Sequence, residues 1–397
     1  LGLLKTNEKN VEAMMEMASI EEKANRFDEA ARWLDRARVD PNAAIPAGSR
    51  LAELHLRTGA IDKALTVSKE VLLRAPENLA VLRLVARVQL ARGDSNSARR
   101  TLTDMGRYAG YDPVAQFEVA RLQVAASDDK GAAYSLDKAL GTQPDFLPAL
   151  VLLAEIELRQ REFAKVEQRI KQISEKSGGG AMALRLQGDL AMARGQQAVA
   201  LTAYGNALSK DDSSDMALRL YGAHVSAGDM AKGVALLDKW QKNHPDNAAV
   251  LRTIGYAALQ VGNLTAARTA YEKILKLQPD DGQTWNNLAL VASAQNDKAA
   301  TGFAERAYAL RPNDPAVIDT LGWLLLRQGQ VDRGLALLRD ARLRDSTDPE
   351  IRYHLAAALA KSGRSTEARE EVAQALKSGT SFEGIEDARK LQTELGK

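Results

Sequence analysis

Some of the residue types and patterns that common kinds of protein chemistry need are missing from this chain of 397 residues. It has no cysteine, which excludes disulfide bonds, thiol nucleophiles and cysteine-based zinc sites. Lysine and arginine (54) nearly balance aspartate and glutamate (52), and this balance argues against a general binder of nucleic acid or of anionic membranes. No apolar run approaches the roughly 18–20 residues that a membrane-spanning helix needs, and the first residues lack the pattern of a signal peptide.

Aromatic residues are also scarce, at 5% of the chain, although hydrophobic residues together make up 45%. Alanine and leucine dominate this apolar fraction, and both are strong helix formers. The composition therefore predicts a folded, soluble and mainly helical protein.

The chain repeats itself with a period of 34 residues, shortened to 33 at two steps. A small residue recurs at this spacing, and a pair of Leu or Ile followed by Gly or Ala recurs about twelve residues before it. Glycine recurs between the two series, and proline closes many repeats. The small-residue series is Ala30, Ala64, Ala98, Ala132, Val166, Ala200, Gly233, Ala267, Ala300, Gly334 and Ala368.

One repeat, residues 248–281, predicts two helices joined by a turn. Apolar residues three, four and seven apart mark one face of each helix. Gly262 and Asn263 end the first helix, because both tolerate the left-handed conformation, and Pro279 stops the second. Gly255 and Ala267 are small, which indicates that the two helices approach closely there.

This pattern resembles the tetratricopeptide repeat (TPR) family, whose signature is W-x2-L-G-x2-Y…A-x3-F…P. Residues 248–281 give L-x2-I-G-x2-A…A-x3-Y…P. The resemblance implies an all-α fold, a right-handed superhelical solenoid of about eleven helix-turn-helix repeats over residues 11–382. We expect the weakest repeat at 147–180, because Val166 fills its small position and its end reads SGGG without proline.

The two ends of the chain carry separate predictions. Residues 3–10 align with 274–281, the end of a second helix, so we expect residues 1–10 to be the remnant of a truncated repeat in a longer protein. Residues 383–397 contain one more amphipathic stretch. This predicts a C-terminal capping helix, which a solenoid needs to cover its last repeat.

The sequence shows no constellation of residues that indicates an enzyme. The four histidines are spread over three repeats, and only His224 and His244 share one, whereas in a solenoid only neighbouring repeats touch. No phosphate-binding loop, dinucleotide-binding, zinc-protease or nucleophile-elbow motif occurs. We therefore predict no catalytic residues, no metal and no cofactor, so that the function lies in a binding surface.

In TPR proteins the first helices line a concave groove, and this resemblance implies where a ligand binds. Two positions of each first helix are expected to face the groove, one after the first apolar anchor and one after the L-G pair. The N-terminal half has arginines at these positions and the C-terminal half has aromatic residues, a composition typical of interface hot spots. An alternative interpretation is that the arginines only solubilise an exposed helix face and pair with glutamates nearby. The candidates are Arg83, Arg87, Phe117, Arg121, Arg185, Arg252, Tyr256, Asn286, Asp319, Trp323, Arg327 and Tyr353.

The last two complete repeats suggest a more specific relationship. The runs TLGWLLLRQG, GLALLRDA and PEIRYHLAAALAKSGR resemble the C-terminal repeats of the PEP-CTERM system TPR-repeat lipoproteins. These bacterial proteins are associated with exopolysaccharide production and protein sorting, and they carry an N-terminal lipoprotein signal that this chain lacks. The resemblance implies a periplasmic or outer-membrane location, with a lipid anchor in the missing N-terminal part; a cytoplasmic location is the alternative.

Three functions remain open on the sequence alone. The first is a protein–protein interaction scaffold that binds a peptide or partner protein, with the exopolysaccharide machinery among its expected partners. The second is a solenoid that binds an acidic polysaccharide or nucleic acid through its arginines, against which the balanced charge argues. The third is a targeting module of an enzyme located upstream.

Overall fold

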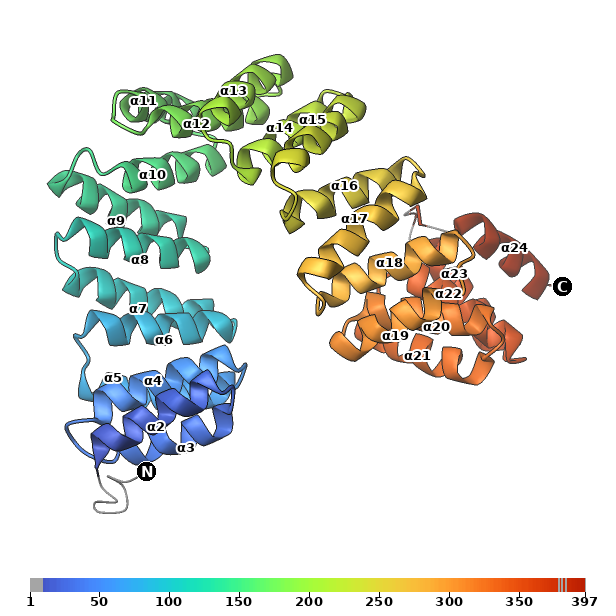
Figure 1. Cartoon of the computed structure of the whole chain (residues 1–397), viewed down its shortest axis with the longest axis horizontal. Coiled ribbons are helices and arrows are strands. Elements are labelled where there is room, and N and C mark those ends of the chain that lie inside the picture. Colours follow the sequence, from blue (N-terminus) through green and yellow to red (C-terminus); the bar gives the residue numbers. More distant parts are fainter. Residues whose placement is uncertain (1–9, 378, 380, 383, 397) are drawn as a thin grey trace. The chain divides into compact units, whose positions relative to one another are not determined.

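The structure, a computed structural model, describes residues 10–377, 379, 381–382 and 384–396. Within these ranges all regular elements are α-helices, as Figure 1 shows. Each even-numbered helix packs on the odd-numbered helix that follows it, and this pair is the repeating element that the sequence predicts. The helices form two compact units: unit 1 ends at Lys210, and unit 2 begins at Asp211.

Unit 1 consists of six helix pairs. Its first helices are α2 (Val11–Lys23), α4 (Ala44–Arg57), α6 (Leu79–Ala91), α8 (Pro113–Ala125), α10 (Leu147–Arg159) and α12 (Gly180–Ala193). Its second helices are α3 (Phe27–Ala37), α5 (Ile61–Arg74), α7 (Ser95–Tyr108), α9 (Asp129–Thr142), α11 (Phe163–Ser174) and α13 (Gln197–Lys210).

Unit 2 consists of five helix pairs and one further helix. Its first helices are α14 (Ser214–Ser226), α16 (Ala248–Gln260), α18 (Gly282–Ala294), α20 (Pro315–Arg327) and α22 (Pro349–Lys361). Its second helices are α15 (Met230–Asn243), α17 (Leu264–Leu277), α19 (Ala300–Leu310), α21 (Val331–Arg344) and α23 (Ser365–Lys377), and α24 (Ile385–Leu395) follows them.

The turn within each helix pair has the same backbone conformation in all eleven pairs. One residue there has a positive φ, the left-handed region that favours glycine. Seven pairs use the glycines that recur in the sequence, Gly59, Gly93, Gly195, Gly228, Gly262, Gly329 and Gly363, with φ between 71° and 82°. The other four pairs use Asn25, Ser127, Arg161 and Asn296. The conformation is therefore fixed by the packing of the pair, even where the residue disfavours it.

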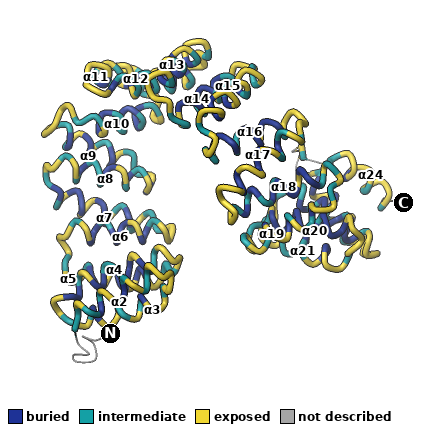
Figure 2. Tube along the Cα trace, viewed as in Figure 1, coloured by how far each residue is buried: buried dark blue, intermediate teal, exposed yellow. Residues whose placement is uncertain are grey.

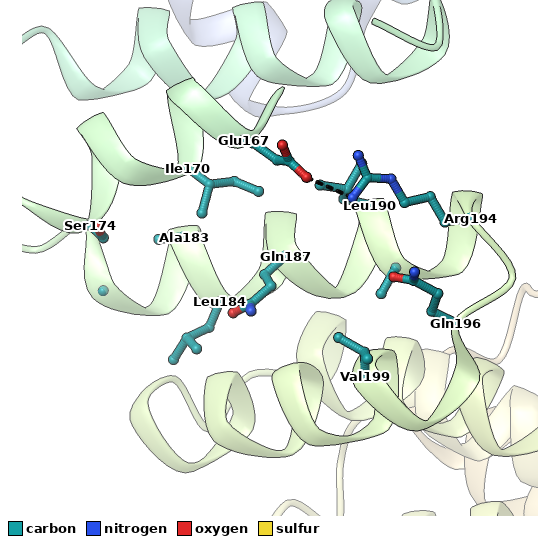
Figure 3. Close-up of a pocket in the computed structure, with 12 residues that line it drawn as sticks. Glu167, Ile170, Ser174, Ala183, Leu184, Gln187, Leu190, Arg194, Gln196 and Val199 are labelled. Atoms are coloured by element: carbon teal, nitrogen blue, oxygen red, sulfur yellow. Dashed lines mark hydrogen bonds and ion pairs between the residues drawn. The ribbon is translucent and has the colours of Figure 1, made fainter. Parts of the chain in front are cut away.

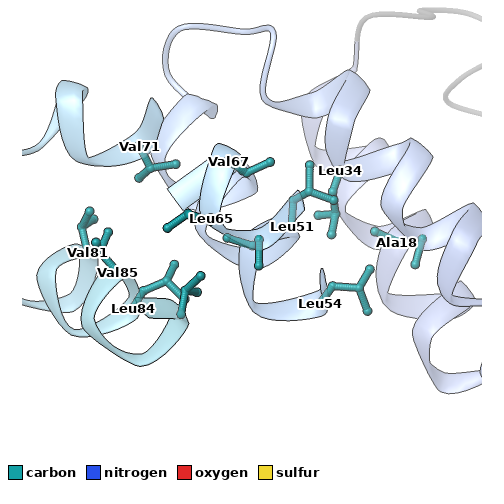
Figure 4. Packing of buried hydrophobic residues seen from close by; sticks show 14 residues of the cluster. Ala18, Leu34, Leu51, Leu54, Leu65, Val67, Val71, Val81, Leu84 and Val85 are labelled. Carbon is teal, nitrogen blue, oxygen red and sulfur yellow. The ribbon is translucent and has the colours of Figure 1, made fainter. Parts of the chain in front are cut away.

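The core of each unit runs from pair to pair, because each second helix also packs on the next first helix. Figure 4 shows this at the start of unit 1, where Leu34, Leu51 and Val67 from three successive helices meet in one buried cluster. Figure 2 shows the same pattern as dark bands along the facing sides of the helices. Each repeat thus completes the burial of its neighbour's apolar face.

Small residues stand where the two helices of a pair approach closely, as the sequence predicts. A Cβ on Gly255 would lie 2.7 Å from the ring of Tyr271, a residue with no exposed surface. Ala267 is fully buried at the same contact. Because bulkier side chains would force the pair apart, the small series follows from the packing.

The pair at 147–180, which the sequence marks as the weakest repeat, is fully formed as α10 and α11. Val166 has no exposed surface, so the larger side chain at the small position is accommodated in the core. The SGGG segment forms a tight turn after α11: Gly178 has φ +78°, and a Cβ on Gly179 would collide with the carbonyl oxygen of Ile173.

Helix α24 packs on α23 and α22. Its Ala388 has no exposed surface and lies in a cluster with Tyr353, Val372 and Ala375. The described part of the expected capping segment thus covers the last pair. The expected remnant of a truncated repeat falls on residues 1–10, of which 1–9 lie outside the described residues.

Candidate binding face

The position directly after each L-G pair recurs once in every first helix from α4 to α22. We call these residues the ladder positions. In unit 1 they are all charged, and in unit 2 they are all uncharged. They are Glu53, Arg87, Arg121, Glu155, Asp189, Ala223, Tyr256, Leu290, Trp323 and Ala357. In each unit these residues form a surface that we call the ladder face, and the chemistry of this surface differs between the two units.

Most of the candidate arginines in unit 1 form ion pairs with carboxylates on adjacent first helices. Each pair joins residues about one repeat apart. They are Arg83–Glu118 at 2.8 Å, Arg87–Glu53 at 2.5 Å and Arg185–Glu155 at 2.6 Å. Arg185 also contacts Asp189 at 3.2 Å, and its side chain is only 12% exposed. The structure thus supports the interpretation that these arginines pair with nearby carboxylates, since their charge is balanced within the face.

Arg121 differs from these arginines. It is exposed on α8, and no carboxylate among the described residues forms an ion pair with it. The neighbouring Glu155 is already paired with Arg185. Unit 1 therefore presents one uncompensated cation at a ladder position.

An apolar pocket of about 290 Å³ lies beside Arg121, between α8, α10 and α12. Phe117, Val151 and Met182 provide its apolar wall, one from each of these helices. The ring of Phe117 is held by an edge-to-face contact with Phe146, at 5.5 Å between the ring centroids. Met182 remains 41% exposed.

In unit 2 the ladder positions leave large apolar side chains in solvent. Tyr256 on α16 is 58% exposed, and Leu290 on α18 is 45% exposed. The next ladder residue, Trp323 on α20, is half-buried and stacks on the His354 ring at 4.1 Å between centroids. Three successive first helices thus carry an apolar stripe of Tyr256, Leu290 and Trp323.

The two candidate arginines of unit 2 have different surroundings. Arg252 forms an ion pair with Asp281 at 2.5 Å. Burial alone would raise the pKa of Asp281, but hydrogen bonds from Thr284 and Arg252 outweigh it and hold this pKa below its usual value. Arg327 is exposed, and its guanidinium donates a hydrogen bond to the Ser293 hydroxyl at 3.1 Å.

Three candidates do not face solvent, so the expectation that they line an open groove is wrong. Asn286, Asp319 and Tyr353 are 3%, 7% and 7% exposed. They occupy the other predicted position, four residues before a ladder position and therefore rotated by about 40° around the helix. In this part of unit 2 that rotation turns them into the contact between repeats: Asp319, for example, accepts a hydrogen bond from Nδ1 of His354 at 2.8 Å.

A second cavity, of about 380 Å³, lies on the side of the second helices, between α11, α12 and α13 (Figure 3). Ile170, Leu190 and Val199 line it together with polar residues. The ion pair between Arg194 and Glu167, at 2.7 Å, crosses its edge. The sequence pattern did not predict this cavity, and no ladder position is among the residues that line it.

The two units also expose residues outside the list of candidates. Leu290 and Val151 occupy positions that the repeat pattern predicts to face the groove, but they were not among the candidates, and Met182 was not expected there. A signal for Leu290 exists in the sequence, since it lies 34 residues after Tyr256 and 33 before Trp323. Met182 begins a helix after the SGGG turn, where the repeat pattern is weakest, so no periodic signal marks it.

The described residues contain neither a candidate metal site nor a candidate membrane-spanning helix. No group of three or more His, Asp or Glu side chains is arranged to hold a metal ion in that part of the chain. No helix there has both the length and the apolar character needed to cross a membrane.

Two family models match the chain. One, described as "Tetratricopeptide repeat", matches residues 252–315 and 320–381. The other, described as "Tetratricopeptide repeat-like domain", matches residues 83–220. Together they cover helix pairs in both units.

Curated relatives match over parts of their length. The chain is 26% identical over 339 residues to the Protein CTR9 homolog of Arabidopsis thaliana, which is 80% of this chain and 30% of that protein. It is 23% identical to the TPR repeat-containing protein PA4667 of Pseudomonas aeruginosa, over 61% of this chain and 35% of that protein. The chain thus spans about a third of the length of these two relatives.

A third relative is the Cellulose synthase 1 operon protein C of Komagataeibacter xylinus. It is 34% identical over 111 residues, which is 28% of this chain and 8% of that protein.

Two solved structures match the chain at low sequence identity. A tetratricopeptide repeat protein from Parabacteroides merdae matches 71% of this chain and 98% of its own, with 16% identity and a TM-score of 0.43. Yeast Tom70 matches 98% of this chain and 88% of its own, with 14% identity and a TM-score of 0.39.

Proposed function

Because the chain belongs to the tetratricopeptide repeat family, we propose that it is a non-catalytic scaffold that binds a peptide or a partner protein on its ladder face. The observation that carries this proposal is the apolar stripe of unit 2. Tyr256 and Leu290 hold large apolar side chains in water at the same position of successive repeats, and packing within the chain gives no reason for that exposure. Contiguous exposed apolar surface marks interaction sites.

The residue types of the stripe fit this role. Tyrosine and tryptophan dominate interface hot spots, because they bury a large area at a small cost in side-chain entropy. Arg252 and Arg327 flank the stripe on α16 and α20 and supply the polar rim that surrounds such a centre. Trp323 is a weaker anchor, since its stacking on His354 already buries part of its ring.

We further propose that the scaffold works in the bacterial envelope, as part of an exopolysaccharide and PEP-CTERM protein-sorting system. Two observations support this finer proposal. The runs TLGWLLLRQG and PEIRYHLAAALAKSGR resemble repeats of that system's lipoproteins. A relative at 34% identity is named for a cellulose synthase operon. A periplasmic or outer-membrane location follows from the same proposal.

The alternative of a polyanion-binding solenoid loses its main support in the structure. Arg83, Arg87 and Arg185 are neutralised by carboxylates. Only scattered cations therefore remain to pair with a polyanion and release the counterions bound to it. No described contact favours the targeting module of an upstream enzyme over a scaffold.

The test compares two double variants of matched chemistry. The first, Tyr256→Ala with Leu290→Ala, removes the stripe. The second, Tyr134→Ala with Leu343→Ala, removes a tyrosine and a leucine that are 64% and 83% exposed on second helices. Each tagged chain is used to capture partners from envelope extracts of the bacterium that encodes it. The proposal predicts that the partner identified with the wild type is lost with the first variant and kept with the second.

Equal recovery with both variants would overturn the assignment of the ladder face. An acidic polysaccharide and single-stranded DNA are titrated beside the protein partner. Tight binding of either one at physiological salt, with no protein partner recovered, would favour the polyanion alternative.

A further inference from the structure

We propose that the pocket of unit 1 is a subsite for an extended acidic peptide segment, in which a large apolar side chain and a carboxylate stand two positions apart. The apolar side chain enters the pocket between Phe117, Val151 and Met182, and the carboxylate pairs with Arg121. This inference rests on the proposed function, because it names the kind of segment that one part of the scaffold binds.

The size and lining of the pocket select its occupant. Small-molecule sites have volumes of roughly 300–1,000 Å³, and this pocket, at about 290 Å³, lies at the lower limit of that range. One aromatic or large aliphatic side chain is an occupant of suitable size. Its lining residues come from three successive first helices, and Phe117 and Arg121 line it from the same helix, so a chain that runs along α8 passes the pocket and the guanidinium in turn.

The charge of the site selects the neighbouring group. The other candidate arginines of this face in unit 1 are held by Glu53, Glu118 and Glu155. Arg121 and Glu155 both line the pocket. Glu155 is held by Arg185, and no carboxylate among the described residues forms an ion pair with Arg121. A guanidinium at the rim of an apolar pocket binds a carboxylate through two parallel charge-assisted hydrogen bonds, which no neutral group can replace.

The spacing within the segment follows from backbone geometry. Phe117 and Arg121 are one turn apart on α8, which is about 6 Å along the helix axis. In an extended chain, residues two positions apart point to the same side and lie roughly 7 Å from each other. An apolar residue in the pocket and an acidic residue two positions away therefore reach both features at once, whereas directly adjacent residues point to opposite sides.

The experiment selects peptides without assuming a natural partner. A phage-displayed library of random nonapeptides is panned on the full chain, and the enriched peptide is made synthetically with its Asp→Asn or Glu→Gln counterpart. We expect Phe, Leu or Met two positions from Asp or Glu, and roughly tenfold weaker binding of the amide counterpart, which is the effect of losing one charge-assisted pair.

Variants of the chain assign the binding to this pocket. Arg121→Gln removes the cation, and Val151→Phe fills the cavity from its wall. Both should weaken the acidic peptide about tenfold or more. Arg100→Gln is the matched control, because Arg100 is exposed on the second helix α7, where its guanidinium donates a hydrogen bond to the Ser97 hydroxyl. It should leave the affinity unchanged.

The outcomes separate this inference from the proposed function. Enriched peptides that bind equally well as acid and amide, or that are insensitive to Arg121→Gln, overturn the subsite. If such peptides instead depend on Tyr256 and Leu290, the scaffold function stands without this subsite. If panning enriches no peptide and removal of the stripe leaves every captured partner in place, the scaffold function itself fails.

Discussion

A single added methyl group at Gly334 tests whether the small-residue series is fixed by contact between the helices of a pair. Gly334 lies in α21 and faces α20. A Cβ there would be 2.8 Å from the carbonyl oxygen of Gly322 and 3.0 Å from the backbone nitrogen of Leu326. Both distances are short of the roughly 3.5 Å at which carbon packs against its neighbours. Because both contacts are to backbone, no side-chain rotation relieves them.

Two effects of opposite sign decide the outcome of Gly334→Ala. Replacing a glycine inside a helix by alanine stabilises by about 0.5–1 kcal/mol, whereas overpacking a tight contact costs about 1–3 kcal/mol. We therefore expect a net loss of about 1 kcal/mol. Gly222 in α14 is the matched control, since a Cβ there meets nothing within 4 Å. Gly222→Ala should raise the free energy of unfolding by about 0.5–1 kcal/mol, because alanine favours the helix and meets no opposing contact there.

The assay is urea unfolding of the full chain, with amide hydrogen exchange to locate the effect. In a repeat protein a local change acts mainly on its own repeat and its neighbours, so faster exchange should be confined to α20, α21 and the adjoining helices. If Gly334→Ala is as stable as the wild type, or more stable, while Gly222→Ala gains as expected, the contact does not explain the small series.

Three further predictions test other parts of the account. Ser127→Gly should raise the free energy of unfolding by about 1 kcal/mol, because Ser127 holds φ +55° at a turn where a non-glycine residue costs about 1–2 kcal/mol; an unchanged urea midpoint would contradict this. Burial raises the pKa of Tyr271 to about 12, so the folded state keeps the phenol proton that the unfolded state releases near pH 10. This difference in pKa stabilises the folded state fully below pH 10, and the stabilisation is lost as the pH rises towards 12. Tyr271→Phe should therefore flatten the fall in urea midpoint between pH 10 and 12, and an identical fall in both proteins would contradict this prediction. Because Arg83, Arg87 and Arg185 are paired with carboxylates, the chain should elute from heparin at low salt, and retention above physiological salt would revive the polyanion alternative.

The repeat and its helix pairs were predictable from the sequence because both depend on contacts within about 34 residues. The turn glycines, the buried Ala267 and the close approach at Gly255 all belong to one helix pair. Because these residues recur with the period of the helix pair, their spacing alone was enough to predict the helical repeat fold.

The state of the candidate site residues was less predictable, because it depends on contacts between repeats. Arg87 and Arg121 occupy equivalent ladder positions in the sequence, but only Arg87 forms an ion pair with a carboxylate, Glu53 on the preceding first helix. Asn286 and Asp319 occupy a position that is half exposed in α6 and α16 but buried in α18 and α20. The packing of each repeat on the next decides which of these side chains remains accessible, and one repeat's sequence does not contain that information.

The central claim is that the ladder face binds a partner through exposed apolar anchors, and isothermal titration of one captured partner tests it most directly. Each truncated hot-spot side chain costs more than about 1 kcal/mol of binding free energy. The account therefore predicts that Tyr256→Ala with Leu290→Ala weakens the partner's affinity at least about tenfold, while Tyr134→Ala with Leu343→Ala leaves it unchanged. The same affinity for both double variants and the wild type would contradict the account.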